Sequence, residues 1–359
     1  MTRQLLEGSA AMAEAAIAAG CRFFAGYPMT PFTEVLESFA EKLPTAGGVC
    51  INAESELEAV GMAWGALATG ARAATGSTGQ GLSLMQESLS EITRAELPLV
   101  VFHMARGQGD YYQATRGGGH GDYRQIVLAP ADVQEAVALT QLAFELADRW
   151  RNPVHIYGDF LLAHTAEAVS IEPPSGAALP AKDWAVDGTL GGTGRSRNIN
   201  PIGMQKGVKG IEPERFWRRL QAKHDAMAES EARVELEAVE DAEVVVVAFG
   251  SLARTARYVI RELRREGQRV GLVRPVTLWP FPSQALAQAA AGARCVAVLE
   301  QNAGQMIDDV RLALLGAAPV VGIGDISSDD AGFGVGPIFD PDEVRRRVVG
   351  ALSTSEVRV

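Results

Sequence analysis

The sequence predicts an α/β fold in which two units built around parallel sheets are joined by a loop-rich connector. In residues 1–170 helical and strand patterns alternate, and the strands are apolar runs typical of a parallel sheet covered on both faces. A second alternating series begins near Ala242. We therefore expect one domain over residues 1–170, a connector over 171–235 and a second domain over 236–359.

Strands and helices are expected to alternate along the first domain. An alanine-rich helix ends at Gly20, and a later helix is closed by Gly70, a residue type that commonly ends helices. The expected strands are Arg22–Ala25, Gly48–Ala53, Arg72–Ser77, Pro98–Met104 and Pro153–Tyr157. The expected helices are Thr33–Leu43, Glu56–Thr69, Leu82–Arg94 and Asp132–Trp150.

The connector and the second domain have different patterns. Proline and glycine mark a loop-rich segment at Pro173, Pro174, Gly188, Gly191, Gly192 and Gly194. A charged helix over Glu212–Glu235 follows, and because polar residues occupy most of its faces we expect a bridge rather than a core element. The second domain is expected to contain a turn at Gly250-Ser251 followed by a helix through Leu263, and the strands Glu243–Ala248, Arg269–Val273, Cys295–Leu299 and Val320–Ile323.

The composition excludes several classes of protein. The chain carries 33 Lys and Arg against 44 Asp and Glu, a formal charge of −11, whereas binding to nucleic acid requires a basic face. The alanine-rich start contains Glu14 and is too short to cross a bilayer, so we expect no signal peptide, no membrane span and a cytoplasmic protein. Cys21, Cys50 and Cys295 lack C-x-x-C spacing, and we expect small buried residues rather than cluster ligands or disulfides.

Several motif-like segments do not indicate a site. The glycine clusters Gly107–Gly109, Gly117–Gly119 and Gly332–Gly336 lack the strand and helix context of a dinucleotide fingerprint, and the sequence contains no P-loop. His120 and Asp122 are potential metal ligands on one loop. Such pairs more often make hydrogen bonds, and we expect no metal site in this chain.

Three segments that follow strands are stronger candidates for a site. Gly26–Pro31 contains two prolines, which preset its backbone at the carboxyl end of a strand, although turn formation alone would also explain them. After the next strand, the helix dipole explains Glu54 and Glu58. Glu56 is different, because the Ala- and Gly-rich helix behind it allows backbone to approach closely. The small residues of Thr75–Gly81 suit contact with a flat ring.

Several collinear segments resemble the α subunit of 2-oxoacid:ferredoxin oxidoreductases, especially the 2-oxoisovalerate and 2-oxoglutarate types. They are Gly26–Pro31, Ala53–Glu56, Ser83–Glu87, Met104–Gly107, Tyr112–Tyr123, Arg274–Pro282 and Glu300–Met306. The resemblance covers nearly the whole chain. It implies a domain that holds the aminopyrimidine ring of thiamine diphosphate, followed by a transketolase-like C-terminal α/β domain.

The resemblance implies that the chain holds half of a thiamine diphosphate site. The diphosphate and its Mg²⁺ would lie on a β subunit. In this family the module that binds the diphosphate shows Gly-Asp-Gly followed downstream by Asn-Asn. The nearest candidate here, Gly158-Asp159-Phe160, has no such sequel. The other implied partners are γ and ferredoxin-like δ subunits, with [4Fe-4S] clusters in the partner chains, and ferredoxin. Coenzyme A would accept the acyl group when a 2-oxoacid is oxidatively decarboxylated.

The resemblance also implies roles for individual residues. Glu56 would hydrogen-bond N1′ of the pyrimidine and share the proton that activates the cofactor, assisted by burial, which raises a carboxyl pKa. Thr30 would reach substrate oxygens, and Arg106 would bind the substrate carboxylate through a bidentate guanidinium. The ordinary alternative for Arg106 is an arginine on a surface loop. The implied cofactor-binding residues are Tyr27, Pro28, Thr30, Glu56, Ser77 and Thr78.

One segment departs from the family pattern. Arg106–Gly109 joins Asp110–Gln113 almost directly, where the family usually has a longer stretch, so we expect a reshaped pocket.

Two other interpretations of the function stay open. A pyrimidine-domain subunit of a lipoamide-linked 2-oxoacid dehydrogenase would lack the Gly-Tyr-Pro-x-Thr-Pro signature. A non-catalytic scaffold would not need to retain Glu56, Thr30 and Arg106.

Overall fold

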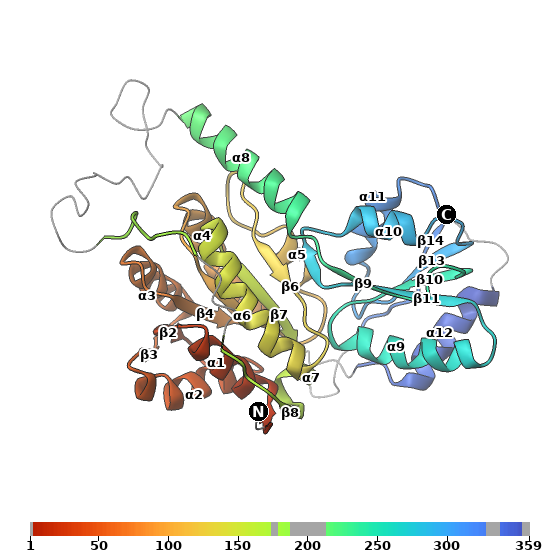
Figure 1. Cartoon of the computed structure of the whole chain (residues 1–359), viewed down its shortest axis with the longest axis horizontal. Coiled ribbons are helices and arrows are strands. Elements are labelled where there is room, and N and C mark those ends of the chain that lie inside the picture. Colours follow the sequence, from red (N-terminus) through yellow and green to blue (C-terminus); the bar gives the residue numbers. More distant parts are fainter. Residues whose placement is uncertain (1–2, 174–178, 187–212, 328–337, 354–359) are drawn as a thin grey trace.

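Two α/β units lie side by side in the computed structural model, which describes residues 3–173, 179–186, 213–327 and 338–353. Figure 1 shows the N-terminal unit on the left and the C-terminal unit on the right, with helix α8 (Pro213–Ser230) along the upper edge. The predicted α/β class is confirmed. Several positions named from the sequence lie outside the described residues: Pro174, Gly188, Gly191, Gly192, Gly194, Glu212 and Gly332–Gly336.

The N-terminal unit is built on a seven-stranded sheet with the order β12-β6-β7-β5-β4-β2-β3. Its strands are β2 (Phe23–Gly26), β3 (Val49–Asn52), β4 (Ala73–Ser77), β5 (Val100–Ala105), β6 (Ile126–Leu128), β7 (Val154–Asp159) and β12 (Thr277–Trp279). Neighbouring strands are parallel except β12, which runs antiparallel to β6. Strands β4, β5 and β7 are completely buried, which agrees with their mainly apolar or small residues.

Helices cover both faces of this sheet. On one face lie α1 (Gly8–Ala18), α2 (Thr33–Lys42), α6 (Val133–Trp150) and α7 (Phe160–His164). On the other face lie α3 (Glu56–Ala68) and α4 (Gly79–Arg94). The remaining short elements are β1 (Gln4–Glu7), its antiparallel partner β8 (Ala166–Val169), the 3₁₀ turn Pro44–Ala46, and α5 (Tyr111–Thr115).

The C-terminal unit has a five-stranded sheet with the order β14-β13-β10-β11-β9. Its strands are β9 (Val234–Glu237), β10 (Val244–Val247), β11 (Val270–Pro275), β13 (Cys295–Val298) and β14 (Val320–Gly322), parallel except for β9. Its helices are α9 (Gly250–Arg265), α10 (Ser283–Ala289), α11 (Met306–Leu314) and α12 (Pro341–Ser353). The apolar stripe of α9 packs with α12 on one face of the sheet, and α10 and α11 cover the other.

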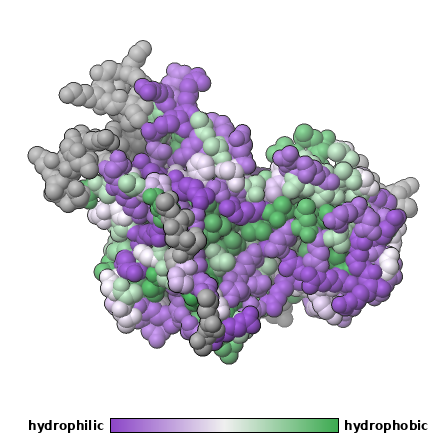
Figure 2. Space-filling view, viewed as in Figure 1, coloured by the Kyte–Doolittle hydropathy of each residue, from purple (hydrophilic) through white to green (hydrophobic). Residues whose placement is uncertain are grey.

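Contacts between the two units are extensive. Strand β12 belongs to the second half of the chain but extends the N-terminal sheet. The buried Arg274 of β11 pairs with Glu135 of α6 at 2.6 Å and with Glu235 of β9 at 2.8 Å. Figure 2 shows hydrophobic residues gathered in a band between the units. One hydrophobic cluster contains both Tyr157 of the first unit and Phe249 of the second.

The charged helix differs from the expectation in two ways. It ends at Ser230, and Val234–Glu237 forms strand β9, because valine and leucine alternate there with glutamate at the two-residue period of a strand. The expectation that this helix stays outside any core is also wrong. Four of its residues are buried at helical spacing: Phe216, Leu220, His224 and Met227.

The cysteines lie in apolar surroundings. Cys21 and Cys295 are buried, as predicted, whereas Cys50 is half-buried. Burial raises the pKa of the Cys21 thiol to about 12 and that of the Cys50 thiol to about 11, so both stay protonated near neutral pH. In the part of the chain that the structure describes, no helix is both long enough and apolar enough to cross a membrane.

Candidate functional site

The carboxyl ends of four strands bring the predicted site residues to one edge of the N-terminal sheet. Gly26 of β2 is in register with Asn52 of β3 and with Gly76 of β4, and Ser77 is in register with His103 of β5. Parallel sheets commonly bind ligands at this edge. The residues at or just after these strand ends include Tyr27, Pro28, Thr30, Glu56, Ser77, Thr78 and Arg106.

Glu56 is the glutamate near the start of α3 that is buried. It is only 3% exposed, and its Oε1 accepts a hydrogen bond from Ser77 Oγ at 3.2 Å. Ser55 caps the helix by accepting from Glu58 N at 3.3 Å, and Glu58 in turn accepts from Glu54 N at 3.0 Å. Glu58 therefore serves the helix end, and Glu54 is exposed.

Gly81 allows the first turn of α4 to lie directly against this carboxylate. A Cβ atom at position 81 would lie 2.3 Å from Glu56 Oε1 and 2.0 Å from Ser77 Oγ, closer than atoms can approach. Thr78, at the N-cap position of α4, has a buried Oγ1 with no hydrogen-bond partner among the described residues. The strand end and the helix start thus hold two hydroxyls and one carboxylate close together.

Thr30 and Arg106 form a second pair. Arg106, directly after β5, donates from Nε to the backbone carbonyl of Thr30 at 3.1 Å. Its two Nη groups make no hydrogen bond within the described chain, so they remain available to a ligand. Tyr27, Pro28 and Thr30 are exposed, and no hydrogen bond between described residues links them to Glu56.

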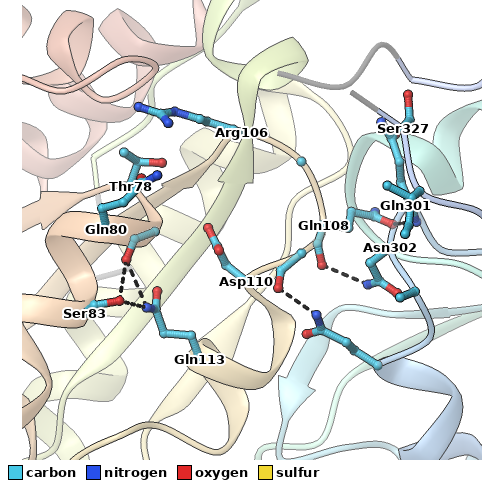
Figure 3. Close-up of a pocket in the computed structure, with 16 residues that line it drawn as sticks. Thr78, Gln80, Ser83, Arg106, Gln108, Asp110, Gln113, Gln301, Asn302 and Ser327 are labelled. Carbon is cyan, nitrogen blue, oxygen red and sulfur yellow. Dashed lines mark hydrogen bonds between the residues drawn. The ribbon is translucent and has the colours of Figure 1, made fainter. Parts of the chain in front are cut away.

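A cavity of about 610 Å³ opens between the two units beside this pair. Figure 3 shows Thr78, Gln80 and Ser83 on one side and Gln301 and Asn302 of the C-terminal unit on the other. The Arg106 side chain extends toward Thr78, and Asp110 lies between the two walls. The described lining is polar and rich in side-chain amides, which come from Gln80, Gln108, Gln113, Gln301, Asn302 and Gln305.

The shortened loop after β5 is fixed to the C-terminal unit. Gln108 is 3% exposed, and its Nε2 donates to Phe249 O at 3.0 Å while its Oε1 accepts from Gln301 N at 2.8 Å. Its backbone carbonyl accepts from Asn302 Nδ2 at 2.9 Å, and Gln305 donates to Gly109 O at 2.7 Å (Figure 3). This loop therefore forms a wall of the cavity whose position depends on both units.

Helix α11 holds the other side of this contact in place. Glu300 accepts from the backbone N–H groups of Gln305 at 3.0 Å and Met306 at 2.7 Å, which fixes the turn before the helix. Tyr111 donates to Asp309 at 2.6 Å. Burial, and then the neighbouring Asp309, raises the pKa of Tyr111 well above its usual value, so this phenol stays protonated and keeps donating.

Two features that the sequence left without a function serve the structure. Asp159 accepts from Leu162 N at 2.9 Å and from Ser251 Oγ at 2.8 Å, and burial raises its pKa. His120 lies 2.8 Å from Glu91, in line with the expectation that it makes polar contacts. Among the described residues, no group of three His, Cys, Asp or Glu side chains is arranged to hold a metal ion.

Sequence reasoning gave no role to most residues of the cavity, among them Gln108, Asp110, Gln301 and Asn302. Gln301 and Asn302 lay in a segment that was matched to the family but given no role, and the match was the available signal. Gln108 and Asp110 lay in the shortened loop, where the departure from the family pattern was the available signal. The positions of Gln108, Gln301 and Asn302 depend on how the two units meet.

Two family models match the chain. The model for pyruvate flavodoxin/ferredoxin oxidoreductase, thiamine diphosphate-binding, matches residues 14–236. The model for pyruvate:ferredoxin oxidoreductase core domain II matches residues 242–330. Ketoisovalerate oxidoreductase subunit VorB from Methanothermobacter thermautotrophicus is 40% identical over 328 residues, covering 87% of this chain and 90% of that protein.

Two solved structures share the fold. The 2-oxoglutarate:ferredoxin oxidoreductase from Magnetococcus marinus, with 2-oxoglutarate, coenzyme A and succinyl-CoA bound, has a TM-score of 0.83 at 25% identity. The match covers 98% of this chain but 65% of that one, so this chain spans about two thirds of its length. A split-gene transketolase has a TM-score of 0.60 at 16% identity, covering 98% of this chain and 99% of that chain. The predicted transketolase-like architecture is therefore confirmed.

Proposed function

The chain belongs to the 2-oxoacid:ferredoxin oxidoreductase family, and from this premise we propose that it is the α subunit of such an enzyme. The complex would decarboxylate a 2-oxoacid oxidatively to an acyl-CoA and CO₂ and pass the electrons to ferredoxin. The observation that carries the proposal is the buried carboxylate of Glu56 beside Ser77 at the strand ends. We keep residues 1–170 and 236–359 as the proposed domains, joined by the connector 171–235.

The chemistry of the residues around Glu56 fits the aminopyrimidine ring of thiamine diphosphate. A buried carboxylate can share a proton with a ring nitrogen, and the Ser77 and Thr78 hydroxyls can bond to other polar ring atoms. Because Gly81 has no side chain, the start of α4 can lie close to Glu56, where any side chain at position 81 would collide with the carboxylate. Tyr27, Pro28 and Thr30 are proposed to border the cofactor from the exposed loop after β2.

When bound, thiamine diphosphate supplies the nucleophilic carbon and the electron sink that decarboxylation requires. The proposed task of Glu56 is to hold a proton at N1′ of the pyrimidine, which favours loss of the proton that yields that nucleophile. Ser77 orients the carboxylate through the hydrogen bond to its Oε1. Burial keeps water away from this bond and strengthens it.

Thr30 and Arg106 are proposed to bind the 2-oxoacid. The Nε bond to the Thr30 carbonyl fixes the guanidinium, and the two Nη groups can grip a carboxylate. The Thr30 hydroxyl is proposed to reach the substrate oxygens. Their contact across the strand ends supports a retained catalytic site and argues against the scaffold interpretation.

A second subunit is proposed to complete the site. On α3, which begins at Glu56, Leu57 is 52% exposed and Met62 is 39% exposed. Cβ atoms at Gly61 and Gly65 would meet nothing within 4 Å, so these glycines serve no packing inside the described chain, but they would allow a partner to approach closely. We assign this face to a β subunit that carries the diphosphate and Mg²⁺.

The further proposed partners are a γ subunit, a δ subunit with [4Fe-4S] clusters, and ferredoxin, all in the cytoplasm.

Reduction of a viologen dye by the co-expressed subunits tests the proposal. We expect reduction to require thiamine diphosphate, coenzyme A and a 2-oxoacid together, and a panel that includes 3-methyl-2-oxobutanoate and 2-oxoglutarate identifies the substrate. Acyl transfer to lipoamide without dye reduction would favour the lipoamide-linked dehydrogenase. A complete complex that reduces no dye with any 2-oxoacid would contradict the proposal.

A further inference from the structure

We propose that Asp110, with His103 behind it, accepts the proton of the thiol that receives the acyl group. This inference rests on the proposed function and names a group for one of its steps. The thiolate, not the thiol, is the effective nucleophile, so a thiol that enters the site must lose its proton there. The cavity between the two units is the space beside Arg106 and Thr78 where such a thiol can approach.

Asp110 is the candidate because of what lines this cavity. Among the described lining residues, Arg106 and Asp110 alone carry a charge, and Arg106 cannot act as a base. The other lining side chains are amides, hydroxyls and small or apolar groups, none of which accepts a proton near neutral pH. The Asp110 side chain is 28% exposed, so its carboxylate can meet a ligand in the cavity.

His103 is a buried side chain that can form a hydrogen bond with the Asp110 carboxylate. The residue is completely buried, and neither ring nitrogen has a hydrogen-bond partner among the described residues. Buried polar groups in folded proteins rarely lack a hydrogen-bond partner, so an unpartnered buried ring of this kind calls for a functional explanation. Its Nε2 lies 3.5 Å from Asp110 Oδ2, long for a hydrogen bond, but catalytic hydrogen bonds often shorten only when the ligand binds.

Other groups near the pair are already committed. The Tyr157 and His155 rings lie 4.7 Å and 6.0 Å from the His103 ring, and burial keeps the first protonated and the second neutral near pH 7. The carboxylates of Asp159 and Glu300 accept hydrogen bonds from backbone N–H groups at helix starts. Asp110 and His103 are therefore the two members of this group whose side chains are not committed to another hydrogen bond among the described residues.

The position of Asp110 depends on Gly79. A Cβ atom at position 79 would lie 2.8 Å from Asp110 Oδ1, so the absence of a side chain lets the carboxylate sit against the start of α4. The amide groups of the walls suit an acceptor such as coenzyme A, whose pantetheine arm carries two amides before its thiol.

The step balances as a simple proton transfer. The S–H bond of the thiol breaks, an O–H bond forms on Asp110, and the pair of electrons stays on sulfur as a thiolate. The bond to His103 can then stabilise the protonated acid, and the proton leaves to solvent through the cavity. The step involves no oxidation or reduction.

The test uses the assembled complex with Asp110→Asn, His103→Gln and, as a matched control, Asp122→Asn, an exposed aspartate on the neighbouring loop. Asp110→Asn should retain 2-oxoacid-dependent reduction of the clusters in a single turnover without coenzyme A. Its turnover with coenzyme A should fall about 10²–10⁴-fold. That lost rate should return as the pH is raised toward the pKa of the free thiol, whereas the wild type and Asp122→Asn should not need the higher pH. His103→Gln should show a smaller loss of the same kind.

Calorimetry supplies a readout that does not depend on turnover. Asp110→Asn should bind desulfo-coenzyme A as the wild type does, because the analogue has no thiol. Loss of desulfo-coenzyme A binding would overturn the proposal by making Asp110 a contact to the arm. A wild-type rate with coenzyme A in Asp110→Asn, or a loss that higher pH does not restore, would also overturn it. Absence of single-turnover reduction in the wild type would instead refute the proposed function.

Discussion

Arg106 donates a hydrogen bond from Nε to the backbone carbonyl of Thr30, 3.1 Å away, although 76 positions separate the two residues in the sequence. The bond holds the guanidinium through its Nε–H and leaves the N–H donors of both Nη groups for a bidentate contact with a carboxylate. It also links the loop after β2 to the loop after β5, which carry the two residues proposed to bind the 2-oxoacid. A lysine at position 106 could not replace this arrangement, because it has no Nε–H and no planar fork.

Arg106→Lys should therefore lower kcat/KM by roughly 10²-fold for every 2-oxoacid tested, because a misplacement near 1 Å costs about that much. Binding of thiamine diphosphate to the complex should not change. The measurement is steady-state dye reduction over a substrate panel. A defect confined to one substrate would contradict the clamp and would instead make Arg106, on its shortened loop, a residue that selects among 2-oxoacids.

Gln108→Ala should destabilise the contact between the two units. The variant removes the two hydrogen bonds that Gln108 makes, to the Phe249 carbonyl and to the Gln301 N–H, at about 0.5–1.5 kcal/mol each. Urea unfolding should show the lower free energy of unfolding. Gln221→Ala is the matched control, because the bond from Gln221 to Asp225 is exposed, and it should change stability by less than about 0.5 kcal/mol. Equal stability of the two variants would contradict the proposed role of the loop.

His155 should make the fold sensitive to acid. Burial, and then the neighbouring His103, lowers the pKa of His155 from 6.5 to about 3. Between these values the unfolded chain binds a proton at this residue and the folded chain does not, so the free energy of unfolding falls as the pH drops. The slope from this residue approaches about 1.4 kcal/mol per pH unit.

Urea unfolding at several pH values across that window measures the slope. In His155→Gln the slope should be smaller by nearly 1.4 kcal/mol per pH unit, the contribution of one proton. An unchanged slope in His155→Gln would show that the acid sensitivity comes from other groups.

The isolated chain should bind neither thiamine diphosphate tightly nor any iron. Glu56, Ser77 and Thr78 can contact the pyrimidine, but the diphosphate module and a set of cluster cysteines are missing from the sequence. Equilibrium dialysis of the purified chain, followed by metal analysis, checks both points. Tight stoichiometric binding of the cofactor by the monomeric chain would contradict the division of the site between two subunits.

Local sequence predicted most of the fold because the central strands are apolar on both faces. Strands β4, β5 and β7 are fully buried, and a run of mainly apolar or small residues is the signal for such strands. The signal fails where pairing is distant in sequence. Strand β12 has three residues and joins the N-terminal sheet only because the two units dock, which no local pattern indicates.

Part of the candidate site could likewise be predicted from the sequence and part could not. Glu56 could be distinguished from Glu54 and Glu58 because helix starts explain the other two, and the buried carboxylate agrees with that reasoning. The cavity could not be predicted, because Gln108 reaches Phe249 and Gln301 only after both units have folded. Its amide-rich wall is a property of the interface rather than of any one segment.

The central claim is that Glu56 activates the cofactor, and the exchange rate of the C2 proton of thiamine diphosphate in the assembled complex tests it most directly. Nuclear magnetic resonance after transfer to deuterated water gives this rate for the wild type, Glu56→Gln and the exposed control Glu54→Gln. Glu56→Gln should slow both exchange and turnover by about 10²–10⁴-fold while the complex stays assembled, and Glu54→Gln should match the wild type. Wild-type exchange in Glu56→Gln together with slow exchange in Glu54→Gln would contradict the claim and move the catalytic carboxylate to Glu54.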